Sequence, residues 1–142
     1  TPRFRMNARV TLMDAVRRQA AEIDRALADD IVALALSVAR QMVGQQLAAN
    51  PESVVGVVQD AIDRVLQPAA QASLTLNPED AALVQTHLAE ALATGGWRII
   101  EDPQMARGGC RLHTAACELD ATVNTRWRRI AAALGQELPW QA

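Results

Sequence analysis

Apolar residues recur every three or four positions through the first third of this 142-residue chain. The series consists of Met13, Val16, Ala20, Ile23, Leu27, Ile31, Leu34, Val38 and Met42. Because an α-helix has about 3.6 residues per turn, this spacing places the series on one side of a helix. The sequence therefore predicts one long helix from about Asn7 to Ala49.

The first half of this predicted helix has few apolar residues outside the stripe. A narrow apolar stripe on a long charged helix is typical of a coiled coil, in which a partner helix covers the stripe. We therefore expect residues 1–30 to be the end of a coiled-coil dimerisation helix; packing on the chain's own domain is the alternative. The expected dimer interface comprises Met13, Val16, Ala20, Ile23, Leu27, Ile31 and Leu34.

After Ile31 the apolar face of the helix widens. The additional apolar residues are Val32, Ala35, Leu36, Ala39 and Val43. A helix that is apolar over much of its circumference is usually buried. We therefore expect this half of the helix to be buried in a globular head spanning residues 31–135, with residues 136–142 as a loose tail.

The rest of the chain reads as alternating short helices and strands, separated by Pro and Gly turns. Asn50 and Asn77, each followed by Pro and Glu, are expected to cap the next helix, and Gly95-Gly96 to end one. The expected order is helix, strand, helix, strand, strand, strand, helix, over about 51–66, 72–76, 78–94, 97–101, 109–114, 117–120 and 122–134. The helix between the first two strands predicts a parallel crossover. The fold class is therefore α+β (mixed α/β): a long N-terminal helix, then a small head with a three- to four-stranded mixed sheet packed by helices.

The composition disfavours several classes of function. Lysine is absent, so a P-loop and Schiff-base chemistry are excluded. The net charge of −2 gives no broad attraction to nucleic acid. No apolar run approaches the roughly 20 residues that span a bilayer, and two cysteines favour a reducing cytoplasm. The chain begins at Thr1 rather than Met, so we expect an N-terminal part to be missing.

One stretch, GGCRLHTAACELDA (Gly108 to Ala121), holds Cys110, His113 and Cys117 within eight positions. If its first half is a strand, side chains alternate faces, and Cys110 and His113 cannot converge on one ion. A structural zinc site would also need a fourth ligand. We therefore expect Cys110 to pack with Leu112 under the sheet and predict no metal or cofactor. A hairpin disulfide to Cys117, a metal site, and a small metal- or thiol-dependent enzyme remain alternatives.

Two tryptophans near the C-terminus are candidate contacts for a partner, because aromatic anchors are common in interfaces. Trp127 lies on the apolar face of the last predicted helix, so a place in the core is an alternative for it. Trp140 lies in the tail. The arginines beside Trp127 fan around the polar face of the helix, which disfavours nucleic-acid binding.

The runs LNPED (Leu76 to Asp80) and WRIIEDPQMARGGCRLHTAACELDATVNTRW (Trp97 to Trp127) carry a family resemblance. They resemble the C-terminal half of the FliH family of flagellar assembly proteins, and the likeness covers roughly Ile31 to Gly135. The same pattern marks the equivalent stators of virulence secretion systems, which are the alternative. The ending RWRRIAAALGQELPW looks more like the flagellar type.

The resemblance implies a cytoplasmic, elongated homodimer without enzymatic activity. Its C-terminal domains would bind the N-terminal region of the flagellar type III export ATPase, restrain its activity and help target it to the export apparatus at the inner membrane. Contacts with a basal-body ring protein and the export gate would use an N-terminal segment absent from this chain. The resemblance implies neither nucleic-acid binding nor membrane insertion.

Overall fold

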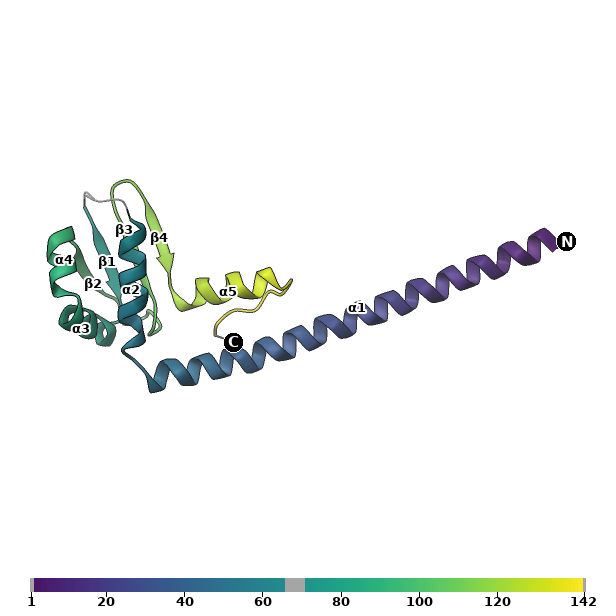
Figure 1. Ribbon diagram of the computed structural model, residues 1–142, viewed down its shortest axis with the longest axis horizontal. Helices are drawn as coiled ribbons and strands as arrows, with labels where there is room; N and C mark the ends of the chain where they lie inside the picture. The colour runs from purple at the N-terminus through teal and green to yellow at the C-terminus, as the bar shows by residue number, and fades with distance from the viewer. Residues whose placement is uncertain (1, 66–70, 142) are drawn as a thin grey trace.

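A computed structural model describes residues 2–65 and 71–141 as one long helix that projects from a small α+β head (Figure 1). The long helix, α1, spans Pro2–Ala49, so the predicted helix is confirmed and begins a few residues earlier than expected. The other elements are α2 (Ser53–Arg64), β1 (Ser73–Leu76), α3 (Pro78–His87), α4 (Ala89–Gly95), β2 (Arg98–Glu101), β3 (Cys110–His113), β4 (Glu118–Ala121) and α5 (Val123–Ala133). None of the described helices is both long enough and apolar enough to cross a bilayer.

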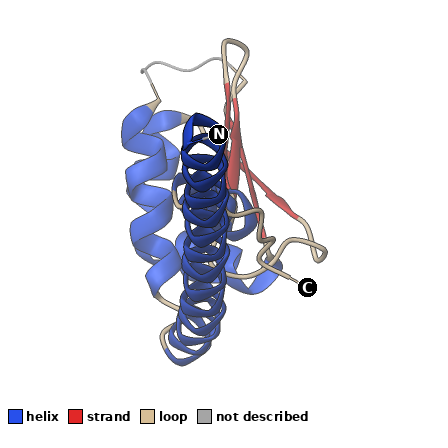
Figure 2. Ribbon diagram, turned by 90° about the vertical axis from the view of Figure 1, so that its right-hand side faces the viewer, coloured by secondary structure: helices blue, strands red, loops and turns tan. Residues whose placement is uncertain are grey.

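The four strands form one mixed sheet in the order β2-β1-β3-β4. β1 and β2 are parallel, as the crossover prediction required, and β3 pairs antiparallel with both β1 and β4. Helices lie on one side of the sheet, which Figure 2 shows nearly edge-on. Leu74 and Leu112 pair across β1 and β3, face these helices and are almost fully buried. The predicted fold class is therefore confirmed.

Two predictions about helix ends were wrong. The helix expected at 78–94 is broken at Leu88, whose backbone leaves the helical region (φ −121°, ψ 23°). No Gly or Pro lies at this break, so the sequence gives no local signal for it. Asn50 does not cap α2, which begins at Ser53 with Glu52 in the capping position and no side-chain cap. The sequence also predicts that Gln67-Pro68 ends the helix expected at about 51–66, and this end lies outside the described residues.

The other predicted caps are confirmed. The side chain of Asn77 accepts a hydrogen bond from the N–H of Glu79 at 3.0 Å, and Pro78 occupies the first turn of α3. Gly96 ends α4 in the left-handed region (φ 67°), where a residue without Cβ has no steric penalty.

The second half of α1 is not buried all round, which corrects the prediction. One side packs against α5 and the tail through Leu36, which is 5% exposed, with Val32 and Ala39 partly buried beside it. The stripe residues Ile31, Leu34, Val38 and Met42 remain 50–68% exposed. The widening of the apolar face therefore reflects two separate apolar sides, of which the head covers only one.

The sequence suggested a loose C-terminal tail, but the tail folds back onto α1. Arg40 Nη1 donates a hydrogen bond to the carbonyl of Pro139 at 2.8 Å, and Gln136 Nε2 donates to the carbonyl of Asp29 at 3.2 Å. These contacts close a second small core, separate from the core under the sheet. It consists of Leu36, Trp127 and Ala131, with Val32, Ala39, Leu138 and Trp140 packed around them.

Candidate interaction site

The predicted dimer stripe lies exposed along α1. Its large members are between 55% and 68% exposed: Met13, Val16, Ile23, Leu27, Ile31 and Leu34. Ala20 is exposed as well. Met6 and Val10, at 63% and 54%, extend the stripe toward the N-terminus, and their spacing of four and three before Met13 was a signal in the sequence that the prediction left out.

The stripe faces away from the part of α1 that touches the head. Successive residues of a helix are rotated by about 100°, so Leu34 and Val38 each lie about 200° from Leu36, the buried contact to the head. The chain's own head therefore does not cover the stripe, which counts against the alternative that the stripe packs on its own domain. A continuous exposed apolar surface of this length makes the stripe a candidate interaction site.

The two candidate tryptophans contact each other in the second core. Their ring centroids are 5.6 Å apart in an edge-to-face arrangement. Trp127 is only 5% exposed, so the alternative that it belongs to the core is confirmed. Trp140 is partly exposed, covers Trp127, and is held by a hydrogen bond from its backbone N–H to Asn124 Oδ1 at 3.1 Å. Of the pair, Trp140 is the residue that presents an aromatic surface to solvent.

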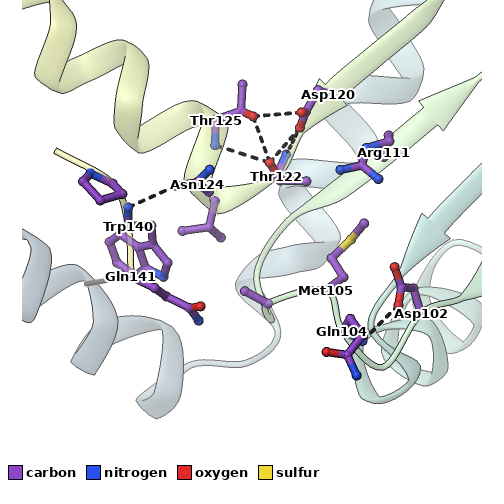
Figure 3. Close-up of a pocket in the computed structure, with 13 residues that line it drawn as sticks. Asp102, Gln104, Met105, Arg111, Asp120, Thr122, Asn124, Thr125, Trp140 and Gln141 are labelled. Carbon is purple, nitrogen blue, oxygen red and sulfur yellow. Dashed lines mark hydrogen bonds between the residues drawn. The ribbon is translucent and has the colours of Figure 1, made fainter. Parts of the chain in front are cut away.

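Beside Trp140 lies a cavity of about 490 Å³ between the β2–β3 loop, the start of α5 and the tail (Figure 3). Asp120, at the end of β4, lines this cavity and is the centre of a hydrogen-bond network. Asp120 Oδ1 accepts hydrogen bonds from the N–H and hydroxyl of Thr122 at 2.9 and 2.7 Å, and Oδ2 accepts one from the hydroxyl of Thr125 at 2.8 Å. Thr122 in turn caps α5. The segment Leu119-Asp120-Ala121 therefore connects β4 to α5 and sets the direction of α5.

This network also sets the charge of Asp120. Partial burial opposes ionisation of the carboxyl, but the hydrogen bonds from Thr122 and Thr125 and the nearby charge of Arg111 outweigh it. The pKa of Asp120 is therefore held below its ordinary value of 3.8. The group is an anion at neutral pH and serves as a hydrogen-bond acceptor rather than a general acid.

A second buried carboxylate joins the two sequence runs that carry the family resemblance. Asp80, 1% exposed, accepts hydrogen bonds from Arg107 Nε at 3.0 Å and from the N–H of Gly108 at 2.8 Å. Gly108 has a φ of 98°, and a Cβ at Gly109 would lie 2.6 Å from the backbone nitrogen of Val123. Glu79-Asp80 of the first run and Gly108-Gly109 of the second run therefore lie at one contact between the two runs. This contact spans 28 positions, so the place of Asp80 at the start of a helix gives no sequence signal for it.

The Cys and His cluster is dispersed, as strand alternation predicted. Cys110 is fully buried beside Leu112, whereas His113 and Cys117 are exposed. Both cysteines are free, and Cys110 pairs across the hairpin with Ala121 rather than with Cys117. Burial raises the pKa of Cys110 to about 12, with a smaller raising effect from Asp120 and an opposing one from Arg126. A neutral, inaccessible thiol is a poor nucleophile, which disfavours Cys110 as the nucleophile of a thiol-dependent enzyme.

Comparisons with known proteins agree with the sequence motifs. A family model described as "Flagellar assembly protein FliH" matches residues 4–130. The flagellar assembly protein FliH of Salmonella typhimurium (strain LT2) is 30% identical over 108 residues, which cover 76% of this chain and 46% of that protein. FliH of Escherichia coli (strain K12) is 29% identical over 108 residues, covering 76% and 47%. The chain thus spans about half the length of these relatives.

Proposed function

The chain belongs to the FliH family of flagellar assembly proteins, and we propose that it acts in flagellar protein export as a non-enzymatic, dimeric regulator of the export ATPase. In this proposal the head binds the N-terminal region of the ATPase, restrains its hydrolysis and helps to bring it to the export apparatus at the inner membrane. Both relatives are named as flagellar proteins, which favours the flagellar system over a virulence secretion system.

The observation that carries the dimer is the exposed stripe of α1. Eight of its members from Met6 to Leu34 are large apolar side chains that are more than half exposed along one side of the helix: Met6, Val10, Met13, Val16, Ile23, Leu27, Ile31 and Leu34. A second copy of the same helix would offer a surface of matching length and chemistry. Each buried methylene would contribute about 0.8 kcal/mol, so pairing over several turns supports a stable dimer.

The arrangement of the head supports a binding role rather than catalysis. Its buried carboxylate Asp80 is engaged with Arg107 and Gly108, and Asp120 is engaged with two threonines. Cys110 is buried as a neutral thiol. These groups stabilise the joints of the head. Trp140, which lies at the surface between two cavities of about 490 and 450 Å³, is the first residue to test for ATPase contact.

The decisive experiment mixes the purified chain with its cognate export ATPase. We expect a complex in size-exclusion chromatography with light scattering at micromolar concentration, containing two copies of this chain, and a lower rate of ATP hydrolysis. A Trp140→Ala variant tests the candidate contact, and Gln141→Ala, at the neighbouring position, is its control. If no complex forms at micromolar concentration and the hydrolysis rate is unchanged, the proposal is wrong.

A further inference from the structure

The edge of the sheet at β4 carries a groove that the family function does not account for. β4 is an edge strand, and Figure 1 shows it as the strand from which the chain enters α5. α2 and α5 leave between them a cleft of about 110 Å³ over this strand. Leu119 and Ala121 of β4 and Val57 of α2 are partly exposed in it and form an apolar floor. The space is large enough for one side chain of a partner.

The rim of this groove is positively charged. Arg64 of α2 and Arg126 and Arg129 of α5 line it, and all three are exposed. Among residues 2–65 and 71–141 none of these three arginines makes an ion pair within 4 Å, in contrast to Arg107, which bridges to Glu79 and Asp80.

Two carboxylates also border the groove, but they do not balance the arginines. Asp120 is engaged by Thr122 and Thr125, and its carboxylate keeps its negative charge. Asp60 on α2 is exposed. Three cations therefore face two anions, and the net positive charge of the groove attracts an acidic ligand.

The main chain of β4 offers a second element of recognition. The N–H of Thr114 donates to the carbonyl of Cys117 at 2.8 Å and closes the β3–β4 hairpin. Hydrogen-bonded pairs alternate along an antiparallel ladder, so the main-chain N–H and C=O groups of Glu118 and Asp120 point away from β3. No other strand of the described chain pairs with this edge. An exposed edge of this kind accepts an added strand from another chain.

From the open edge, the apolar floor and the arginine rim together we propose that β4 is a docking site for an extended acidic segment of a partner protein. The segment pairs its backbone with Glu118 and Asp120, places one apolar side chain against Leu119, and sets carboxylates beside Arg64, Arg126 and Arg129. This site is distinct from the α1 stripe and from Trp140, so this proposal can be tested separately from the proposed ATPase regulation.

The test uses a fluorescein-labelled octapeptide that alternates glutamate with valine, and measures its binding to the full chain by fluorescence anisotropy. We expect micromolar to submillimolar affinity at low salt and changes in the backbone amide resonances of Glu118 and Asp120. A double variant, Arg126→Glu with Arg129→Glu, should weaken binding about tenfold or more. Arg128→Glu, on the same helix but outside the groove, is the matched control and should bind like the unmodified chain. Circular dichroism checks that both variants remain folded.

Four results would overturn the proposal. The first is no binding of the peptide at millimolar concentration. The second is equal binding of a lysine–valine peptide, which would remove the charge argument. The third is equal binding of a peptide whose alternate backbone nitrogens are methylated, because these nitrogens cannot donate to an added strand. The fourth is tighter binding of an oligouridylate octamer, which would assign the arginines to nucleic acid instead.

Discussion

The two cysteines, Cys110 and Cys117, lie in opposite surroundings. Cys110 is fully buried with a pKa raised to about 12, and Cys117 is exposed. We expect a thiol reagent such as Ellman's reagent, at pH 8, to modify Cys117 rapidly and Cys110 only after denaturation. A Cys117→Ser variant isolates the buried thiol. Rapid reaction of that variant under native conditions would contradict the packing described for Cys110.

The raised pKa of Cys110 also predicts how stability depends on pH. Folding favours the protonated thiol, so this contribution to stability is fully present below the ordinary thiol pKa of 9.0 and is lost as the pH rises toward 12. The free energy of unfolding, measured with urea, should therefore fall between pH 8 and pH 10.5. In a Cys110→Ala variant, which is less stable at pH 8 because of the cavity, this alkaline decrease should be smaller. An equal decrease in both proteins would mean that other groups cause it.

A substitution at Asp80 tests the contact between the two sequence runs that carry the family resemblance. An Asp80→Asn change removes the charge from a buried acceptor of two hydrogen bonds and leaves Arg107 without its buried partner. We expect a loss of about 2–4 kcal/mol in the free energy of unfolding. Glu79→Gln is the matched control, because Glu79 makes an exposed bridge to the same arginine and should cost less than about 1 kcal/mol. Similar losses in the two variants would show that burial of Asp80 is not the cause.

At this scale the sequence predicted the faces of residues but not their long-range partners. Strand alternation placed Cys110 and His113 on opposite sides, because the period of a strand is fixed by its backbone geometry. The contact between Asp80 and Gly108 spans 28 positions and depends on how the β2–β3 loop crosses the start of α3. No local pattern encodes such a contact, so it became visible only in the folded chain.

Among the elements, α1 carries the prediction with the largest expected effect. Leu27→Asp places a charge in the middle of the stripe, and each dimer would bury two such charges. We expect the dissociation constant of the dimer, measured by sedimentation equilibrium, to rise at least about 100-fold. Helicity should fall as well, because an isolated helix is only marginally stable in water.

The control for this substitution is Ala21→Asp. Ala21 is exposed and lies about 120° around the helix from Leu27, so the same side chain is introduced outside the stripe. This variant should remain dimeric. If both variants behave alike, or if the unmodified chain is a monomer at all concentrations, the stripe is not the dimer contact.

Periodicity predicted α1 well because its stripe runs over many turns. It misjudged residues 31–43, since a helix with two apolar sides gives the same composition as a buried helix. Only the position of α5 and the tail decides that Leu36 is covered while Leu34 and Val38 are not. The break at Leu88 was missed for a similar reason: it is a change of direction imposed by packing, without a Gly or Pro to mark it.

The described residues 2–65 and 71–141 form two cores at the scale of the whole molecule, and each core joins different elements. The larger core lies under the sheet and joins the sheet to α2, α3 and α4. The smaller core, built around Leu36, Trp127 and Ala131, joins α1 to α5 and the tail. α1 also meets the head where the side chain of Leu47 lies beside Gly108, and it continues into the head through the short turn after Ala49. The direction in which the long helix leaves the head therefore depends on a few side chains, of which Trp140 is the outermost.

A Trp140→Ala variant should weaken the packing of α1 against α5 and the tail without unfolding the head. Removing a fully buried aromatic side chain costs about 3–5 kcal/mol, and Trp140 is only partly buried, so we expect roughly 2 kcal/mol in the docking of α1. The core under the sheet is untouched, and the main thermal transition should remain close to that of the unmodified chain. Emission from the indole of Trp127 should shift to longer wavelength, because Trp140 covers that ring.

The direct measurement is the distance distribution between spin labels on α1 and on the sheet. Labels at Arg25→Cys and Arg98→Cys, in a Cys117→Ser background, report the angle of the long helix against the head. Both positions are exposed and lie outside the two cores. We expect a narrow distribution in the parent protein, a broad one in Trp140→Ala, and a narrow one in Glu137→Ala, an exposed position of the same tail. A distribution that stays narrow without the indole of Trp140 would show that this side chain is not needed to fix the direction of the helix.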